Sequence, residues 1–544
     1  MNLLDWLIII LYIAAVMGVA FYLTRSQTNT EDYYLAGKEM KWWQAGLSNM
    51  ATQLGAISFV SAPVFVALKE GGGLKWLTYE FGVPLAMIIV MAVILPRFLG
   101  GKMISVYEYL ENRFDRSTRL LISFLFQLGR GLATAVTVLA GGLIISTALG
   151  MSTVSAILLL GVITIIYDVV GGIRVVILTD VLQMIIIVVG IIICDFVALE
   201  LVGFEHAWMS LDPSRFQILD FQHWGLTPGE TYSFWPMTLG GLFLYASYYG
   251  TDQSQVQRQL TVGSLDGARK ALLINAFGRF PIVLMYCLMG VFIGAVFASP
   301  DSLTHIASAM NTDGEALKQL LARDPDRMVP MFIFAYLPHG IIGFIFVAIM
   351  AALMSSLDSG LNSLSAVTMR DFYQPFIKPH GTDREYLIAS KVITLFWGIF
   401  CVAVAILFAS IGEATRQTTI VLINAVGSLL YGPILAAFLL GMLVRRVNHA
   451  SVKAGVVAGI GCNLILWLFS DISWLWWNAT GFVAAVVVAL LLSQMGKSFQ
   501  SPESQVTELP VARPASRRWP LVYGIVAGYF FLMILITYWI QHSR

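Results

Sequence analysis

Polar side chains gather on one face of the otherwise apolar stretch Phe346–Tyr373. Five small or polar residues follow one another at i, i+3, i+7, i+10 and i+11, a spacing that places them on one face of a helix. They are Ala352, Ser355, Ser359, Asn362 and Ser363. A carboxyl group, that of Asp358, lies beside this face. Hydroxyl and carboxylate oxygens are the hard ligands that small cations prefer, so the stretch predicts a cation site within a helix.

A purely structural interpretation of the same face is also open. Small residues let helices approach closely, and hydroxyl groups can bond back to their own backbone. Asp358 favours the functional interpretation, because an ionisable side chain inside an apolar segment is costly and typically marks an ion pathway.

The elements that position these residues are membrane helices. Hydrophobic residues make up 58% of the 544 residues and charged residues only 12%, about half of the usual charged fraction of a soluble protein. The net charge of +1 gives no indication of a nucleic-acid partner. The first apolar run, Leu3–Leu23, has no basic start or small-residue cleavage site, so we expect a retained helix rather than a signal peptide. All four cysteines lie in apolar segments and are interpreted as buried thiols: Cys194, Cys287, Cys401 and Cys462.

Apolar runs long enough to cross a bilayer predict about fourteen spans. They cover residues 3–24, 42–69, 76–98, 118–148, 152–170, 178–201, 235–258, 268–298, 329–358, 387–410, 417–443, 451–470, 473–494 and 518–540. If the N-terminus is external, the inside loops hold about 23 Lys and Arg residues and the outside loops about 8. Because basic residues stay on the cytoplasmic side, we expect both termini to be external.

Two of these spans are interrupted by polar residues. The second contains Ser48, Asn49, Thr52, Gln53, Gly55 and Ser58 before Pro63. The seventh contains the run Ser247–Gln253. The two segments are five spans apart, and an odd offset reverses direction through the membrane, so spans 2–6 and 7–11 are predicted to be inverted repeats. Interrupted helices at matching positions of two such halves are typical of a transporter site.

Other classes of protein lack support. The chain shows no soluble domain, no phosphate-binding loop and no metal-spaced set of His or Cys. These absences argue against an ATP-driven pump and against an enzyme. We expect any energy for transport to come from an ion gradient.

Two arginines, Arg130 and Arg279, lie deep inside apolar segments. Buried cations of this kind usually face a cavity, although a long side chain can also extend to the membrane interface. Both lie about eleven residues or more into their spans, which favours the cavity.

Several motifs occur in order along nearly the whole chain. They are Ala36-Gly37-Lys38 with Trp42-Trp43, Glu108–Phe114 (EYLENRF), Gly171–Gln183 (GGxxxVxxTDxxQ), Thr251–Arg258 (TDQxxVQR), the stretch Phe346–Tyr373, and Gly432–Gly441 (GPILAAFLLG). Together they resemble the sodium/solute symporter family, which includes the sodium/glucose, sodium/galactose and sodium/sialic acid symporters. The resemblance implies an all-α polytopic membrane protein with a LeuT-type five-plus-five inverted repeat, flanking helices and alternating access.

The same resemblance implies how the chain is divided. Residues 1–41 would form a leading helix and loop, 42–201 the first five-helix repeat, 235–443 the second repeat, and 444–544 three C-terminal helices of a single transporter domain.

The resemblance also implies a first sodium site between the interrupted second span and the ninth. Its ligands would be the carbonyls of Ala51, Leu54 and Ala352 with the hydroxyls of Ser355 and Ser356, all neutral oxygen donors that suit Na⁺.

A second cation site, found in some members such as the sialic acid symporters, would use Asp180, Ser355, Asp358 and Ser359. Asp358 departs from those relatives, which carry a hydroxyl residue there. Two carboxylates near one site either hold a cation between them or share a proton, so both roles stay open for Asp358.

For the solute, the resemblance implies a substrate site made of Ser58, Glu80, Arg130, Tyr248, Arg279 and Asn424. Most of these match positions that bind sugars, whereas Arg130 resembles the arginine that holds the carboxylate in sialic acid symporters. Gly55 departs from those symporters, which have a hydroxyl there. A structural ion pair, Arg130–Glu80 or Arg279 with a carboxylate, is the alternative without a ligand.

The sequence therefore predicts a Na⁺-coupled symporter, with one or two sodium ions, for a small polar solute such as a sugar or a sugar acid. The alternatives are a symporter of another carboxylate or a vitamin-like solute, or a sensor or uniporter with the same fold. We expect a multi-pass protein of the cell (inner) membrane that contacts lipid and needs no obligate protein partner.

Overall fold

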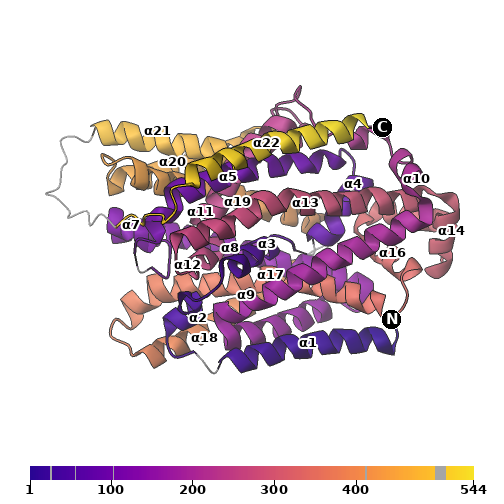
Figure 1. The fold of residues 1–544 in the computed structure, drawn as a ribbon, viewed down its shortest axis with the longest axis horizontal. Coiled ribbons are helices and arrows are strands. Elements are labelled where there is room, and N and C mark those ends of the chain that lie inside the picture. Colours follow the sequence, from indigo (N-terminus) through magenta and orange to yellow (C-terminus); the bar gives the residue numbers. More distant parts are fainter. Residues whose placement is uncertain (25–26, 56, 102, 411–412, 496–509, 544) are drawn as a thin grey trace.

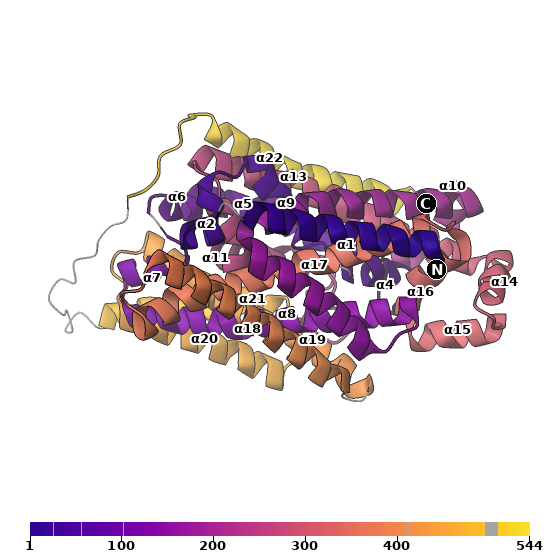
Figure 2. The same ribbon diagram turned by 90° about the horizontal axis from the view of Figure 1, so that it is seen from below.

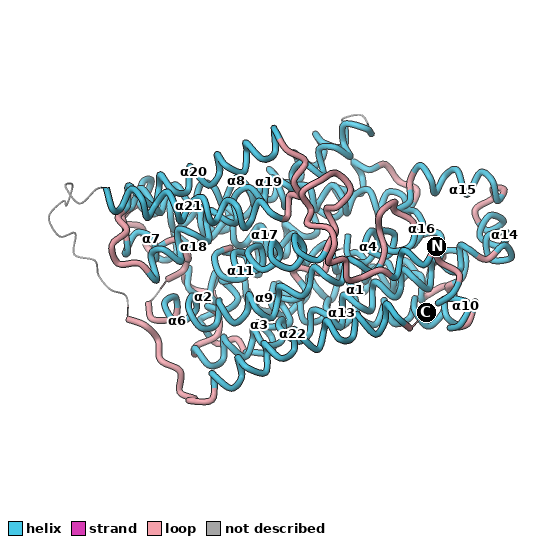
Figure 3. Tube along the Cα trace, turned by 90° about the horizontal axis from the view of Figure 1, so that it is seen from above, coloured by secondary structure: helices cyan, strands magenta, loops and turns pink. Residues whose placement is uncertain are grey.

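The computed structural model describes residues 1–24, 27–55, 57–101, 103–410, 413–495 and 510–543. Within them the chain is almost entirely helical, and the only strand-like feature is an isolated bridge between Glu39 and Val262. Most long helices run side by side along the long axis of the molecule (Figures 1 and 3). Ten helices or helix runs of the described part are long and apolar enough to cross a membrane. The prediction of a polytopic helical protein is confirmed, while the count of fourteen spans stays a prediction.

The α-helices are α1 (Leu3–Thr24), α2 (Thr30–Leu35), α3 (Trp42–Ala51), α4 (Ala62–Ala67), α5 (Gly82–Ile89), α6 (Leu95–Phe98), α7 (Glu108–Arg113), α8 (Arg116–Leu149), α9 (Thr153–Val202), α10 (Phe204–Met209), α11 (Gly241–Thr251), α12 (Gln253–Leu260), α13 (Leu265–Ala298), α14 (Pro300–Ala309), α15 (Gly314–Arg323), α16 (Met328–Tyr336), α17 (Ile341–Val367), α18 (Asp383–Ser410), α19 (Glu413–Leu443), α20 (His449–Phe469), α21 (Trp476–Met495) and α22 (Trp519–His542). Short 3₁₀- or π-helical segments are η1 (Ala36–Lys38), η2 (Ile57–Ser61), η3 (Leu74–Phe81), η4 (Val90–Ile94), η5 (Pro213–Phe216), η6 (Pro236–Gly240), η7 (Pro325–Arg327) and η8 (Thr368–Ile377).

The second and seventh predicted spans are interrupted, as their sequences predict. In the second, α3 ends at Ala51 and helical structure resumes with η2 at Ile57. In the seventh, α11 ends at Thr251, and Asp252 adopts an extended conformation (φ −82°, ψ 123°) before α12 begins. Both breaks free backbone groups that can bind a ligand only where they line a protected cavity.

The 50-residue helix α9 folds back on itself at Gly172. A straight helix of this length would extend about 75 Å, more than twice the thickness of a bilayer core. Gly172 has φ 58° and ψ −168°, a conformation that L-residues with a side chain rarely adopt. Tyr167, before the break, donates to the carbonyl of Met354, and Tyr12, which binds Gln183 after the break, reaches the sulfur of the same residue. The two arms of α9 therefore lie beside each other and correspond to the fifth and sixth predicted spans.

The predicted start of the ninth span, residue 329, is wrong. The short helix α16 ends at Tyr336, and Gly340, with φ 92°, precedes a new helix, α17. Pro338 accounts for the break, since a proline disfavours helical structure in the residue before it. From Ile341 the chain then stays helical beyond the predicted end at 358, through η8 to Ile377.

Helix α1 caps the beginning of α17. The side chain of Asp5 is fully buried and accepts hydrogen bonds from the backbone N–H groups of Gly340 (2.6 Å) and Gly343 (3.0 Å). These amides have no partner within their own helix, and a carboxylate at a helix N-terminus also interacts favourably with the helix dipole. The leading helix is thus attached to the helix that carries the predicted cation ligands.

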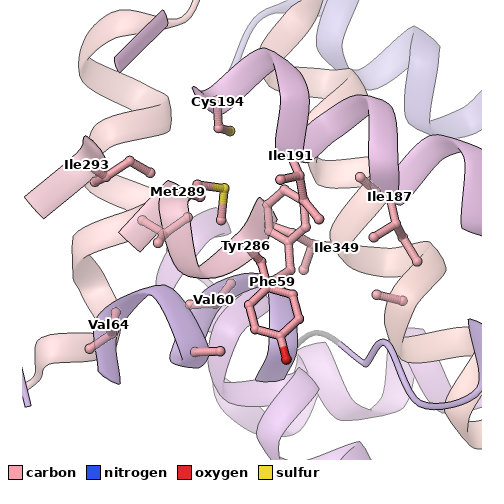
Figure 4. Packing of buried hydrophobic residues seen from close by; sticks show 14 of the residues in the cluster. Phe59, Val60, Val64, Ile187, Ile191, Cys194, Tyr286, Met289, Ile293 and Ile349 are labelled. Carbon is pink, nitrogen blue, oxygen red and sulfur yellow. The ribbon is translucent and has the colours of Figure 1, made fainter. Parts of the chain in front are cut away.

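Close packing fixes the second half of the interrupted second span, after the break. Figure 4 shows Phe59, Val60 and Val64 facing side chains of α9, α13 and α17. Those side chains are Ile187, Ile191 and Cys194 of α9, Tyr286, Met289 and Ile293 of α13, and Ile349 of α17. Within a bilayer the gain from such contacts comes from close packing rather than from removal of surface from water.

Both termini lie at the same end of the molecule, near α14 (Figures 1 and 2). At the opposite end, α7 meets η8 in a network of ion pairs. Arg370 donates to Glu108 (2.9 Å), and Arg119 donates to Asp371 (3.0 Å). The network joins two of the sequence motifs, EYLENRF and the end of Phe346–Tyr373.

Candidate functional site

A cavity of 390 Å³ lies between the interrupted second span and helices α8, α11, α13 and α17. Its size is within the usual range of small-molecule sites. Five of the six predicted substrate residues line it: Ser58, Glu80, Arg130, Tyr248 and Arg279. The side chain of the sixth, Asn424, lies outside the described residues. The sequence thus identified, from five separate elements, side chains that the fold brings to one cavity.

The break after α3 lies against the middle of α17. The Ser355 hydroxyl is 3.3 Å from the carbonyl oxygen of Ala51 and 3.1 Å from that of Ala352. The Ser356 hydroxyl is 3.1 Å from the carbonyl oxygen of Thr52 and 3.3 Å from that of Ala352. Two hydroxyls and three carbonyls therefore converge, with no charged group among them.

Four of the five predicted ligands of the first sodium site belong to this group. Leu54, the fifth, is buried in the same turn and donates its amide to the Ala51 carbonyl (3.0 Å). The carbonyl of Thr52 is an additional neighbour that the sequence did not indicate. Neutral oxygens of this kind suit a monovalent cation, and a Cβ atom at Gly55 would lie 3.3 Å from the Ser356 hydroxyl.

The predicted second cation site contains a positively charged side chain. Arg258 of α12 is fully buried; it donates to the carboxylate of Asp180 (3.0 Å) and also to the hydroxyl of Ser359. Ser359 is in turn 3.2 Å from the carboxyl of Asp358. The hydroxyl of Ser355 belongs to the first group of oxygens, and only its carbonyl, which accepts from Ser359, borders this one.

Arg258 is a residue whose role the sequence did not reveal, although the motif Thr251–Arg258 contains it. Its partners come from α3, α9 and α17, since Ser48 also accepts from its Nε (2.6 Å). A buried charge surrounded by this many partners holds three helices in register, and it neutralises one of the nearby carboxylates.

Among the described residues, no group of three or more His, Cys, Asp or Glu side chains is arranged to hold a metal ion. Any cation site here must therefore rely on hydroxyl and carbonyl oxygens with at most two carboxylates.

Arg130 pairs with Asp252, the residue at the break between α11 and α12. Only one oxygen of Asp252 faces the arginine, because the other accepts from the amide and hydroxyl of Ser254. The guanidinium of Arg130 lies over the ring of Tyr248, 5.1 Å from its centre, and its Nε has no hydrogen-bond partner. The pairing with Glu80 that was the alternative for Arg130 does not occur.

Arg279 instead takes Glu80, in a two-point ion pair. Its Nε and Nη2 lie 3.0 Å and 2.7 Å from the two oxygens of Glu80, and both residues are more than nine-tenths buried. The hydroxyl of Tyr245 contacts both members, at 3.2 Å and 3.1 Å. The ion pair of Arg279 with a carboxylate is thus present, and both of its members line the cavity.

Two further polar residues, which the sequence did not assign to the site, lie in or near it. Gln53, at the break after α3, lines the cavity, and neither polar atom of its side chain has a hydrogen-bond partner. Asp168, in α9, is fully buried near Asp180 and Asp358. The signal for both was present: a polar residue at a predicted break, and an acid inside an apolar span.

Comparisons with known proteins give independent evidence on the family of the chain. The sequence profile of the sodium:solute symporter family matches residues 33–459. The sodium/sialic acid symporter NanT of Aliivibrio fischeri is 30% identical over 510 residues, which are 91% of this chain and 94% of that protein. The sodium/glucose cotransporter of Vibrio parahaemolyticus is 28% identical over 486 residues, or 86% of this chain and 85% of that protein.

A solved structure is also similar. It is the substrate-bound outward-open state of a Na⁺-coupled sialic acid symporter, described as revealing a novel Na⁺ site. It superposes with a TM-score of 0.78 at 25% sequence identity and covers 91% of this chain and 98% of that one.

Proposed function

This chain belongs to the sodium:solute symporter family, and from that premise we propose that its solute is a sugar acid such as sialic acid. It is a sodium-coupled symporter with an all-helical, LeuT-type fold that spans the membrane. Its transported partners are sodium and a small solute.

The observation that carries the proposal is Arg130. This arginine lines the cavity, is held by a single oxygen of Asp252, and keeps its Nε unpaired. A guanidinium binds a carboxylate most strongly through two parallel hydrogen bonds, and Arg130 has donors left to make them. The aromatic ring of Tyr248 beneath it fixes the plane in which those donors point.

Sodium at the first site would connect the two halves of the machinery. The ion's ligands would be carbonyls at the break after α3 and the hydroxyls of Ser355 and Ser356 on α17. Binding would therefore stabilise the arrangement in which the break and α17 lie together, and release would let them separate. Each sodium driven inward by the membrane potential contributes about 2.3 kcal/mol per 100 mV.

A second sodium would bind where Asp180, Asp358 and Ser359 meet, with the carbonyl of Ser355 at its border. The guanidinium of Arg258 lies in this space, so sodium must share it with that charge or shift the side chain. We infer that the negative charge of Asp358 offsets the repulsion between sodium and the guanidinium of Arg258.

The neutral-sugar alternative rests on a different observation. Glu80, Arg279 and Ser58 offer acceptors and donors along the same cavity, which suits hydroxyl groups. For the setting, we infer an inner membrane with both termini external, lipid as the surrounding partner, no obligate protein partner and no enzymatic activity. The basic residues near α7 and α8, at the end opposite the termini, favour this orientation.

The test is uptake by the purified protein in proteoliposomes with an inward sodium gradient. Sialic acid, a neutral hexose, a polyol and a monocarboxylate are compared as radiolabelled solutes. We expect accumulation of sialic acid that stops when sodium is replaced by choline. Accumulation of the hexose alone would make the sugar alternative correct, and accumulation at full rate without sodium would contradict symport.

A further inference from the structure

The carboxyl group of Asp168 has almost no hydrogen-bonding support. The residue is 0% exposed, at the end of the first arm of α9, four residues before the fold at Gly172. One oxygen accepts a long hydrogen bond of 3.5 Å from Asn362 of α17, and the other has no partner. An ionised carboxylate so poorly supported is expensive in a membrane interior, whereas a neutral carboxylic acid is not.

The surroundings of Asp168 also contain too few hydrogen-bond donors. Asn362, which donates to Asp168, accepts from the amide of Gln257 (2.7 Å), and the amide oxygen of Gln257 has no donor. One oxygen of Asp180 and the amide oxygen of Gln183 are unpaired as well. All of these groups are fully buried. Four acceptor oxygens in one buried region thus lack a donor. This lack indicates that bound protons or cations satisfy them.

Charge counting leads in the same direction. Three buried carboxyls, those of Asp168, Asp180 and Asp358, lie near one another, and a single guanidinium, that of Arg258, faces them. Arg258 is committed to Asp180. If all three carboxyls were ionised, the region would hold two excess negative charges. One sodium ion at the proposed second site would leave one of them, and a proton on Asp168 would remove the last.

Titratable or charged groups come from several elements packed around Asp168, and α1 adds Tyr12 near Tyr167. The others are Tyr33 and Tyr34 of α2, Tyr167 and Asp180 of α9, Arg258 of α12, Asp358 of α17 and Lys391 of α18, whose ammonium lies 6.0 Å from the ring of Tyr33. The hydroxyl of Tyr33 binds the backbone carbonyl of Asp168 rather than its carboxyl (3.3 Å). None of these cations pairs with the carboxyl of Asp168 directly.

Two cavities are lined by residues of α17 and α2, the helices that contact Asp168. Ser359 and Gly360 of α17 line the substrate cavity. A separate polar cavity of 250 Å³ is lined by Asp32, the neighbour of Tyr33, and by Gln27, whose amide donates to the carbonyl of Gly171. A proton could thus arrive from the cavity that admits the solute and leave to the opposite side.

We propose that Asp168 binds a proton that crosses the membrane with the solute, so that this symporter moves a proton as well as sodium. The proton adds to one oxygen of the Asp168 carboxylate from the outer solution and leaves that oxygen to the cytoplasm, with no other bond made or broken. The inference rests on the proposed symport but does not depend on which solute is carried.

The experiment uses the full chain in proteoliposomes that enclose a pH-sensitive dye, with an inward sodium gradient and sialic acid as the solute. In the wild type, adding sialic acid should acidify the interior, and uptake should slow as the external pH rises, because fewer proteins carry the proton. Asp168→Asn, which resembles the protonated acid, should keep sodium-driven uptake, lose the acidification and lose the pH dependence. Glu200→Gln, which neutralises an exposed acid near the end of α9, should behave as the wild type.

The outcomes separate this inference from the proposed function. Sodium-driven uptake without acidification, and with the same pH profile in the wild type and in Asp168→Asn, would overturn the proton site and leave symport intact. If sialic acid is not taken up at all, infrared spectroscopy of the purified protein decides. The wild type should then show the carbonyl band of a protonated carboxyl that fades at high pH and is missing in Asp168→Asn, and absence of that difference would refute the inference.

Discussion

Arg279 and Arg130 both bring a positive charge to the same cavity, but their carboxylate partners bind them through different numbers of oxygens. Glu80 holds Arg279 with both carboxylate oxygens, and Tyr245 completes the pair. Asp252 holds Arg130 with one oxygen only, since Ser254 occupies the other. The first arginine is fixed in the wall of the cavity by two bonds and leaves only its Nη1 unpaired, whereas the second is held by one bond and leaves its Nε unpaired.

This difference shows how a structural buried arginine can be distinguished from one that binds a ligand. Depth in the membrane is similar for the two and does not distinguish them. What distinguishes them is whether the partner is free to give both of its oxygens. When the partner carboxylate also accepts from another donor, the arginine keeps hydrogen-bond donors that can bind the carboxylate of a ligand.

The largest expected effect is that of Arg279→Ala. The change would leave Glu80 ionised and buried without its cationic partner, at a cost of about 3–5 kcal/mol. We expect a large drop in the melting temperature of the detergent-solubilised protein and loss of transport of every solute. Glu80→Gln combined with Arg279→Gln is the control, and it should recover much of the stability. A normal melting temperature for Arg279→Ala would show that this pair is no more structural than the other.

Arg130→Gln should have a smaller and more selective effect. Losing the guanidinium should weaken binding of a carboxylate solute by about 2 kcal/mol or more, roughly thirtyfold, while binding of a neutral sugar changes little. Equilibrium binding of both solutes to the purified variant measures this difference. Arg130→Lys should lie between the wild type and Arg130→Gln, because an ammonium cannot make the two-point contact. Equal losses for both kinds of solute would make Arg130 structural, like Arg279.

Ser355→Ala and Ser356→Ala should have the smallest effect, and it should leave both arginines untouched. Each removes one neutral ligand of the proposed first sodium site, worth about 1 kcal/mol, so half-maximal uptake should need about fivefold more sodium. The sodium dependence of uptake at saturating solute measures this change. Ser363→Ala, a hydroxyl change on the same helix, is the control. An unchanged sodium dependence in both variants would rule out this site.

Much of the fold follows from local chemistry that a sequence displays. The breaks in the second and seventh spans were predictable because polar residues and glycine interrupt apolar runs there. The polar face of α17 was predictable from helical spacing. The start of α17 was missed because residues 329–336 are as apolar as the helix that follows, and only Pro338 and Gly340 separate them.

The partners of the charged residues could not be predicted in the same way. Arg130 and Asp252 are 122 positions apart, and Arg258 meets side chains from three other segments. Nothing in the local sequence of Arg130 selects Asp252 over Glu80, because the choice depends on how the break after α11 faces α8. Asp168 was overlooked for a related reason, since its importance comes from the absence of support around it. The repeat boundaries at 42–201 and 235–443 stay a prediction.

The unbroken passage of α17 into η8 has a mechanical consequence. Ser355 and Asp371 lie on one continuous rod, sixteen residues and about 24 Å apart. A rod of this kind acts as a lever: a tilt of about 10° around the sodium ligands would displace the far end by about 4 Å. That displacement is enough to pull Asp371 out of reach of Arg119. Binding or release of a single sodium ion could in this way break the ion pair between Arg119 and Asp371 at the far end of the rod.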